Sequence, residues 1–372
     1  MLSLEDKKWV NEIWDKTVAK MEKVARRSYD KLPYITVDGV HDDMKEKHIF
    51  TWTNGFFGGL MWLLYSQSKK EVFKDTAIHQ EELLDKAFER YEFLHHDVGF
   101  MWLLTSGANY KLTENRESFL RLMHAADILG SRFDIDGRFI RAWPIKRGNY
   151  SIIDSMMNLN LLFWASDAIG EDRYRKIAMA HADMTMEHHI RPDGSVVHVV
   201  EHDLVTGQAV APKTGQGYDE NSSWSRGQGW ALYGFTLAYI HTGKQEYLDT
   251  AKKVAHYFLA AVAEDYLPRC DFRSPEEPVY YDTSAGAVAA CGLIELARIL
   301  PEHEKRMYFY GAMKLLKTME KHFCDWDDNT DAILTMSSAA YYNKPVNVPI
   351  IFGEFYFIEA LHKLMGNEVF PW

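Results

Sequence analysis

The sequence has little cysteine, no excess of positive charge and no long hydrophobic run. Three cysteines, an odd number without a Cys-x-x-Cys pair, argue against a disulfide framework and are typical of a reducing compartment. Acidic residues outnumber basic ones by 53 to 42, and the net charge of -11 disfavours nucleic acid and anionic membranes as partners. No apolar run reaches the roughly 18 residues that a membrane-spanning helix needs, and the charged, amphipathic start MLSLEDKKWVNEIWDK is unlike a signal peptide. We therefore expect a soluble, cytoplasmic protein.

Aromatic residues, in contrast, are abundant. They make up 14% of the chain, with 11 Trp, 20 Tyr and 20 Phe, which is more than a plain helical scaffold needs. The rest of the composition, 47% hydrophobic and 26% charged, is ordinary for a globular protein and excludes disorder, collagen and coiled coil. Because no linker divides the chain, we expect one domain, residues 1–372, with an oligomeric state that the sequence leaves open.

Two kinds of helical segment alternate along the chain. The first kind is amphipathic, with charges on one side, and occurs near residues 5–29, 77–94, 115–129, 170–188, 244–263 and 303–323. The second kind is apolar nearly all round, which indicates burial on every side, and occurs at residues 52–65, 97–107, 152–166, 225–240, 284–297 and 352–364. Six exposed helices alternating with six buried ones predict an all-α fold, an (α/α)6 barrel whose inner helices begin at a common rim.

Two strand-like inserts interrupt the helices. One is RFIRAWP, after the Asp136-Gly137 turn, and the other is GSVVHVVEHDLVTGQAV, after Asp193-Gly194, which alternates as a hairpin does. Inserts on one rim tend to wall a cleft. We therefore expect small β-hairpins beside the active site.

Each inner segment begins near a group that could contact a ligand: Asn54, Asp97, Asp154, Arg226, Ser284 and Glu354. For Asp97 and Asp154 the simpler interpretation is a helix cap, since Asp is favoured there. Both, however, begin all-apolar helices, and His95-His96 and Trp143 precede them. Paired carboxylates at the mouth of an aromatic cleft indicate acid and base chemistry on a sugar.

The segment GQGYDENSSWSRGQGW, residues 215–230, is the densest in candidate binding residues. A Trp offers a flat apolar face to a sugar ring, and Arg226 offers a planar fork to a carboxylate. The alternative is a loop followed by ordinary core aromatics. His198, in the hairpin insert, is by itself more typical of a structural histidine than of a catalytic one.

A metal site among His95, His96, Asp97, His188 and His189 is a further possibility. Adjacent histidines do not easily share one ion, and no His-x-x-x-His pair with a third ligand occurs. We therefore expect neither a metal nor another cofactor.

Several motifs, in order, resemble the unsaturated glucuronyl hydrolases of glycoside hydrolase family 88. They are WTNGFFGG, HHDVGFMW, IIDSMMNLNLL, RPDGSVVHV and SWSRGQGW, and the resemblance extends from about residue 50 to residue 364. It implies an (α/α)6 barrel that removes the 4-deoxy-hex-4-enuronic acid which polysaccharide lyases leave at the non-reducing end of oligosaccharides. The substrate would thus be an unsaturated uronic-acid oligosaccharide, for example from a glycosaminoglycan.

The resemblance also implies roles for individual residues. The catalytic Asp of the IID motif corresponds to Asp154, and its partner in the HHD motif corresponds to Asp97. Asp154 would protonate C4 of the vinyl ether and then orient the water that adds at C5. Positions that contact the sugar correspond to Trp52, His96, Trp143, His198, Gln216, Trp224, Arg226 and Trp230.

One departure from the family bears on specificity. Members that accept sulfated fragments resemble one another in an Arg before the Gln of the substrate loop and in a Ser-x-x-Ser-x-Lys stretch near the C-terminus. Here the corresponding residues are Gly215, Ala339, Tyr342 and Lys344, so that only the Lys is kept. This pattern predicts a preference for unsulfated disaccharides.

Three alternatives stay open. An unsaturated rhamnogalacturonyl hydrolase shares the barrel and the hydration chemistry but acts on pectin fragments. A sugar epimerase would use His96 and His198 as paired bases and would leave the two Asp residues without a role. A non-catalytic sugar-binding protein needs the aromatic residues and Arg226 but not the acid pair.

Overall fold

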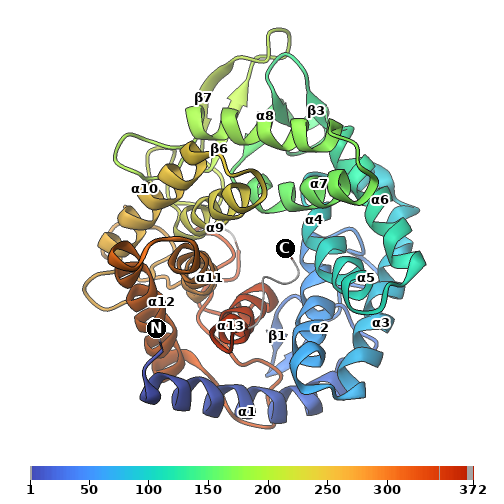
Figure 1. Cartoon of the computed structure of the whole chain (residues 1–372), viewed down its shortest axis with the longest axis vertical. Coiled ribbons are helices and arrows are strands. Elements are labelled where there is room, and N and C mark those ends of the chain that lie inside the picture. Colours follow the sequence, from blue (N-terminus) through green and yellow to red (C-terminus); the bar gives the residue numbers. More distant parts are fainter. Residues whose placement is uncertain (1, 343, 367–371) are drawn as a thin grey trace.

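A computed structural model describes residues 2–342, 344–366 and 372. Within these residues, six inner helices surround the axis of a barrel and six outer helices enclose them (Figure 1). The predicted (α/α)6 barrel is thereby confirmed. The inner ring consists of α2 (Phe56–Ser68), α4 (Val98–Trp102) with its continuation α5 (Ala108–Thr113), α7 (Ser155–Ile169), α9 (Ser225–Thr242), α11 (Thr283–Ile299) and α13 (Ile351–Leu364). The outer ring consists of α1 (Leu4–Arg27), α3 (Glu71–Phe88), α6 (Arg116–Gly130), α8 (Arg173–His188), α10 (Gln245–Ala261) and α12 (Glu302–Phe323).

Burial explains why the two rings differ in sequence. In the outer helix α1, the buried apolar residues Val10, Ile13, Trp14, Met21 and Val24 recur at helical spacing along one face. In the inner helix α9, every residue from 225 to 238 is buried, because neighbours pack on all sides. The apolar content of the inner segments is therefore a consequence of their place in the barrel.

Some helix boundaries differ from the sequence prediction. The outer helix expected near 77–94 begins at Glu71 and ends at Phe88, and a 3-10 turn, Tyr91–Phe93, follows it. The inner helix expected at 97–107 contains a π-helical turn, Leu103–Gly107, and continues to Thr113. A π-helical turn inside a helix frequently lies close to a functional site, and this one lies one turn beyond the start of α4.

Two glycines allow the first inner helices to pack closely. A Cβ at Gly55 would lie 2.1 Å from the carbonyl oxygen of Phe100, and a Cβ at Gly99 would lie 2.6 Å from Oδ1 of Asn158. Only glycine leaves room for these contacts. Because Gly99 follows Asp97 by two residues, this packing also determines where that carboxylate lies.

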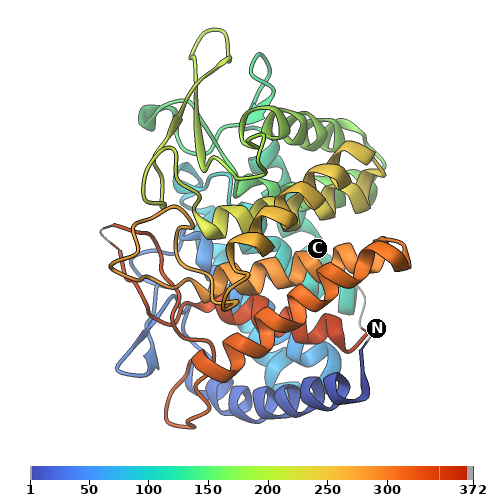
Figure 2. The same ribbon diagram turned by 90° about the vertical axis from the view of Figure 1, so that its left-hand side faces the viewer.

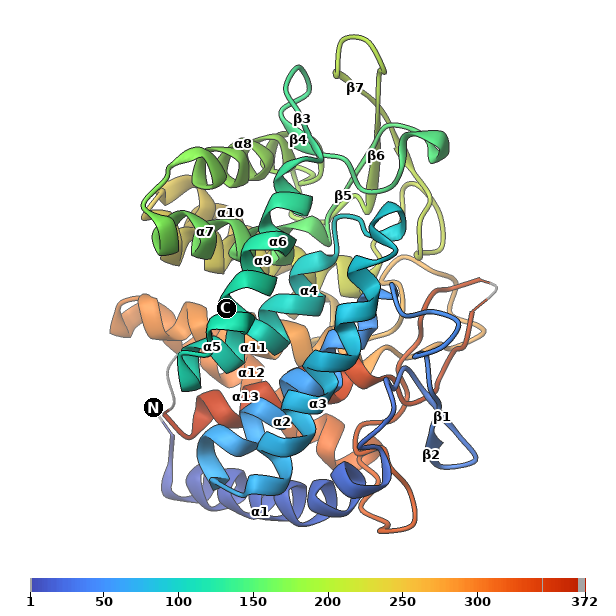
Figure 3. The ribbon, with the colours of Figure 1, turned by 90° about the vertical axis from the view of Figure 1, so that its right-hand side faces the viewer.

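The inserts form small antiparallel sheets at one end of the barrel. Strands β5 (Tyr150–Ile152), β6 (Val199–His202) and β7 (Ala209–Lys213) form a sheet in that order, so the predicted hairpin of the second insert is confirmed. Strands β3 (Phe133–Asp134) and β4 (Phe139–Ile140) pair, as do β1 (Thr36–Val37) and β2 (Val40–His41). Figure 2 and Figure 3 show β1, β2 and β5–β7 with the long loops on one side of the molecule, while the N-terminus lies on the other. In the part of the chain that is described, no helix is long and apolar enough to cross a membrane.

Candidate active site

A cavity of about 470 Å³ lies at the end of the barrel that carries the inserts, since Trp143 and Ile152 are among its lining residues. Seven of the ten predicted site residues line it: Trp52, His96, Asp97, Trp143, Asp154, Gln216 and Arg226. They come from the starts of inner helices and from the loops before them, so the common rim expected from the sequence brings them together. Residues that line the cavity without having been predicted to contact the sugar include Tyr34, Phe50, Phe93, His95, Arg147 and Phe352.

The two carboxylates are not helix caps. Asp97 immediately precedes α4 and Asp154 immediately precedes α7, yet neither side chain forms a capping hydrogen bond. Both are nearly buried, with 7% and 9% of their surface exposed, and both line the cavity. The simpler interpretation of these residues as caps is therefore wrong, and their carboxyl groups are available to a ligand.

An amide and two imidazoles lie next to the Asp97 carboxyl group. Oδ1 accepts a hydrogen bond of 3.4 Å from the Asn158 side chain, and Oδ2 lies 3.5 Å from His95 Nδ1 and 3.3 Å from His96 Nε2. Burial, together with the nearby charge of Asp154, raises the pKa of Asp97 well above its usual range. Burial also lowers the pKa of His95 to about 3 and that of His96 well below its ordinary value, so both imidazoles are neutral. Burial and the charge of Asp154 both favour the protonated form of Asp97.

Asp154 faces His198 on the other side. Its Oδ1 lies 3.5 Å from His198 Nε2, and neither of these buried atoms has a hydrogen-bond partner. His198 does not line the cavity; its ring lies against Trp224, with centroids 4.1 Å apart. The backbone joins the two segments, because Ile153 N–H donates to the His198 carbonyl at 3.0 Å. His198 thus supports Asp154 from behind the cavity wall.

Arg226 lines the cavity, but the protein itself occupies most of its fork. One Nη forms an ion pair with Asp282 and donates to Ser338 O at 2.8 Å, and the other donates to Ala339 O at 2.8 Å. The guanidinium lies between the rings of Trp224 and Phe352, at 4.5 and 4.8 Å from their centroids. Only Nε has no hydrogen-bond partner. Arg226 therefore joins three segments beneath the cavity, and most of its hydrogen-bond donors are not free to bind a ligand carboxylate.

The four predicted Trp residues lie at different depths. Trp52 stacks on Phe352 with centroids 5.0 Å apart, and Trp143 meets His96 edge-to-face at 6.2 Å; both line the cavity. Trp224 and Trp230 do not line it. Trp230 is fully buried, and its ring lies 5.2 Å from that of Phe100 in the barrel core. The structure thus separates two Trp residues that face the cavity from two that pack behind its wall.

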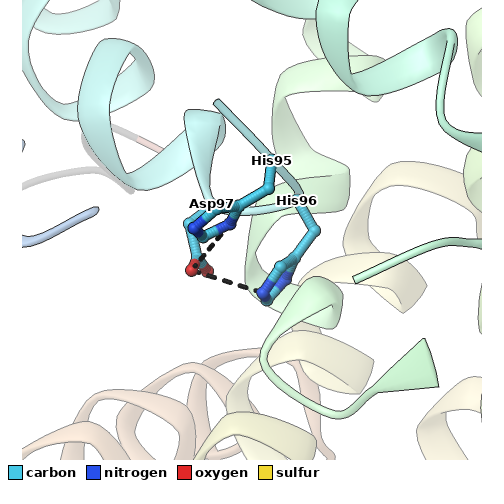
Figure 4. A group of neighbouring side chains, drawn as sticks. All are labelled: His95, His96 and Asp97. Atoms are coloured by element: carbon cyan, nitrogen blue, oxygen red, sulfur yellow. Dashed lines mark ion pairs between the residues drawn. The ribbon is translucent and has the colours of Figure 1, made fainter. Parts of the chain in front are cut away.

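The structure places three of the five residues considered as metal ligands close together. Among the described residues, one group of His, Cys, Asp or Glu side chains could hold an ion, and it consists of His95, His96 and Asp97, with ligand atoms within 4.8 Å of one another (Figure 4). The two adjacent histidines, which the sequence suggests do not easily share one ion, thus lie with their ligand atoms close together. His189 belongs to a different group, since its Nε2 lies 2.8 Å from the Ser151 hydroxyl. That the protein needs no metal stays a prediction.

The four positions that were compared with sulfate-accepting family members differ in whether they line the cavity. A Cβ at Gly215 would lie 2.1 Å from His198 Nδ1, so this segment packs directly on the histidine. Ala339 and Lys344 line the cavity, whereas Tyr342 is 51% exposed and does not. The family resemblance had already identified Lys344 as a candidate residue near the substrate. Phe50, Phe93 and Arg147 lack any comparable signal, because they lie on loops that only the fold brings to the cavity.

Comparisons with known proteins agree with this geometry. The sequence model of Glycosyl Hydrolase Family 88 matches residues 20–293. An unsaturated glucuronyl hydrolase of Bacillus sp. (strain GL1) is 34% identical over 92% of this chain and 93% of that protein. An unsaturated chondroitin disaccharide hydrolase of Streptococcus pneumoniae is 33% identical over 98% of this chain and 94% of that protein. The crystal structure of an unsaturated glucuronyl hydrolase from Streptococcus agalactiae has a TM-score of 0.91 at 28% identity, covering 98% of this chain and 93% of that one.

Proposed function

The chain belongs to glycoside hydrolase family 88, and we propose that it removes 4-deoxy-hex-4-enuronic acid from the non-reducing end of unsaturated glycosaminoglycan oligosaccharides by hydrating the C4=C5 double bond. The observation that carries this proposal is the pair Asp97 and Asp154. Both begin inner helices without capping them, and both face one cavity that aromatic side chains line. The names of the relatives, which act on unsaturated glucuronyl groups and chondroitin disaccharides, support this class of substrate.

The reaction requires a proton donor that later accepts a proton. A carboxyl group transfers its proton to C4, and positive charge develops at C5 and the ring oxygen. Water then adds to C5 and returns a proton to the carboxylate, and the resulting hemiketal opens to release the saccharide and a keto-uronate. The separation rule for inverting and retaining glycosidases does not apply, because the chemistry begins at the double bond and not at the glycosidic carbon.

We assign the proton transfer to Asp154. Its Oδ1 has no hydrogen-bond partner in the protein, whereas Asn158 and two histidines surround the oxygens of Asp97. The raised pKa of Asp97 favours its protonated form, and a protonated carboxyl group can donate a hydrogen bond to a ring hydroxyl. Asp97 therefore acts as the positioning partner of the pair.

Other residues would hold the sugar. Trp52 and Trp143 provide apolar ring faces at the cavity wall, and His96 provides a neutral imidazole. Because the fork of Arg226 is engaged and its Nε is buried, the uronate carboxylate would receive its positive partners from the rim cations Arg147 and Lys344, which line the cavity. We keep the preference for unsulfated disaccharides as part of the proposal.

The test follows the double bond directly. An unsaturated chondroitin or hyaluronan disaccharide is mixed with the protein in the presence of a chelator, and the loss of ultraviolet absorbance is recorded. We expect rapid decay with the unaltered protein and none with Asp154→Asn, which should still bind the disaccharide. Asp172→Asn is the matched control, because Asp172 also precedes a helix without capping it but lies exposed on the outer ring. If Asp154→Asn keeps a tenth of the rate, Asp154 is not the acid.

A second substrate tests the pectin alternative. Decay of an unsaturated rhamnogalacturonan disaccharide, with no decay of the glycosaminoglycan disaccharides, would replace the proposed function with that of a rhamnogalacturonyl hydrolase. A faster rate on a sulfated disaccharide than on its unsulfated counterpart would contradict the expected preference for unsulfated substrates but not the proposed reaction.

A further inference from the structure

The segment Gly215-Gln216 packs directly against the imidazole of His198. The backbone N–H of Gln216 donates a hydrogen bond of 2.9 Å to His198 Nδ1. A Cβ at Gly215 would lie 2.1 Å from the same nitrogen, so no residue with a side chain fits there without moving the segment or the ring. The glycine therefore makes the hydrogen bond possible.

The segment cannot easily move away from His198. The Gln216 side-chain amide donates to Ala339 O at 2.7 Å, and the Gln216 carbonyl accepts from Tyr341 N–H at 2.8 Å. These bonds attach Gln216 to the loop that also holds Arg226. The donor that faces Nδ1 is thus a fixed part of the cavity wall.

This contact determines which nitrogen of His198 carries the proton. A backbone N–H is always a donor, so Nδ1 must be the acceptor, and in a neutral imidazole the hydrogen then resides on Nε2. Nε2 lies 3.5 Å from Asp154 Oδ1, and neither atom has another partner. The nitrogen that carries the hydrogen is therefore the one that lies beside the carboxyl group that reacts.

We propose that Gly215 and Gln216 hold His198 in its Nε2–H tautomer, so that His198 stabilises the carboxylate of Asp154 after that residue has protonated the sugar. This inference rests on the proposed function and deepens it. Because Nδ1 is occupied and Nε2 already carries hydrogen, His198 cannot remove a proton from water, and that task falls to Asp154. His198 is accordingly a positioning residue and not a second base.

His96 and His189 are titratable neighbours of His198. Burial lowers the pKa of both, to about 3 in His189. Trp224 covers one side of the ring. Among the described residues, Nε2 of His198 has no hydrogen-bond partner, and the Asp154 carboxyl group lies 3.5 Å from it.

The first experiment measures the tautomer without using activity. The unaltered full-length protein is labelled with nitrogen-15 in its histidines, and the side-chain nitrogens of His198 are assigned by the signals that disappear in His198→Gln. At neutral pH we expect Nε2 to carry hydrogen and Nδ1 to carry none. A hydrogen on Nδ1 overturns the inference whatever the protein's activity. The expected tautomer in a protein that leaves every unsaturated disaccharide intact would instead refute the proposed function.

The second experiment compares two replacements of His198. The amide nitrogen of Gln can occupy the position of Nε2, whereas that of Asn reaches only the position of Nδ1. Loss of a hydrogen bond to a charged group predicts that kcat of His198→Asn falls about tenfold below that of His198→Gln, with KM values that agree within about twofold. Equal kcat values in the two variants contradict the inference.

A glycine variant tests the segment itself. In Gly215→Ala we expect a lower kcat and an alkaline limb of the kcat profile displaced to higher pH, because the Nε2 hydrogen no longer stabilises the carboxylate. Gly130→Ala is the control, since its nearest neighbour would lie at an ordinary 3.7 Å. An unchanged pH profile in a folded Gly215→Ala protein refutes the role of the segment.

Discussion

The buried ion pair between Arg226 and Asp282 predicts a large loss of stability when only one partner is changed. Asp282 immediately precedes α11, and Arg226 lies in the first turn of α9. Their side chains are 0% and 1% exposed. The variant Asp282→Asn keeps the size of the side chain but leaves the guanidinium charge of Arg226 without its counter-ion.

The magnitude follows from what Arg226 keeps. Removing one partner of a buried pair costs about 3–5 kcal/mol, because the remaining charge is not compensated. In Asp282→Asn, the guanidinium still donates to Ser338 O and Ala339 O and still lies between two aromatic faces. We therefore expect the lower end, a loss of about 3 kcal/mol in the free energy of unfolding. The pair itself is not a source of stability, since desolvation raises the pKa of Asp282 in spite of the attraction by Arg226.

The assay is urea unfolding, followed by far-ultraviolet circular dichroism at constant pH. Asp328→Asn is the control, because Asp328 pairs with Lys23 on the surface, with both side chains more than half exposed, and should unfold like the unaltered protein. The double variant Arg226→Met, Asp282→Leu should lose less than Asp282→Asn, because it leaves no charge buried. If Asp282→Asn loses less than about 1 kcal/mol in the free energy of unfolding, and the dependence of that free energy on urea concentration is unchanged, the reasoning is refuted.

Three further predictions concern single residues. Burial raises the pKa of Glu354 from 4.5 to about 8, so the folded protein holds a proton there that the unfolded chain releases, and stability should fall as pH rises between these values. Glu354→Gln should remove that part of the decline when unfolding midpoints are measured from pH 5 to 8. An equal decline in the variant and the unaltered protein would contradict this prediction. Gly99→Ala should destabilise the protein and lower its activity, because the added Cβ would lie 2.6 Å from Asn158 Oδ1. The control Gly130→Ala should leave the melting temperature nearly unchanged. Equal melting temperatures for the two variants would refute the packing argument. Asp97→Asn should lower kcat and raise KM together, as measured by initial rates on the disaccharide, and a change in neither beyond about twofold would leave Asp97 without a role in the site.

Much of the architecture could be predicted from the sequence because its signals are local. Charged residues on one face mark an outer helix, and apolar residues all round mark an inner one, since each pattern reflects how many sides of the helix meet neighbours. Alternation of the two patterns predicts the barrel, and its inner helices share one rim. The positions of Asp97 and Asp154 at that rim follow from their places at the starts of apolar segments, and the order of the motifs identifies the family.

The direction of individual side chains was decided only by the tertiary structure. An inner helix that is apolar all round has no polar face to show how it is rotated about its axis. Its sequence therefore does not distinguish a residue that faces the cavity from one that faces the core. Trp230 packs in the core, and the fork of Arg226 meets Asp282, which lies 56 residues further along the chain. The tautomer of His198 likewise depends on its contact with Gln216, which lies 18 residues further along the chain. Periodicity in a sequence reports how much of an element is buried, whereas the partner of each polar atom is set by the elements that pack around it.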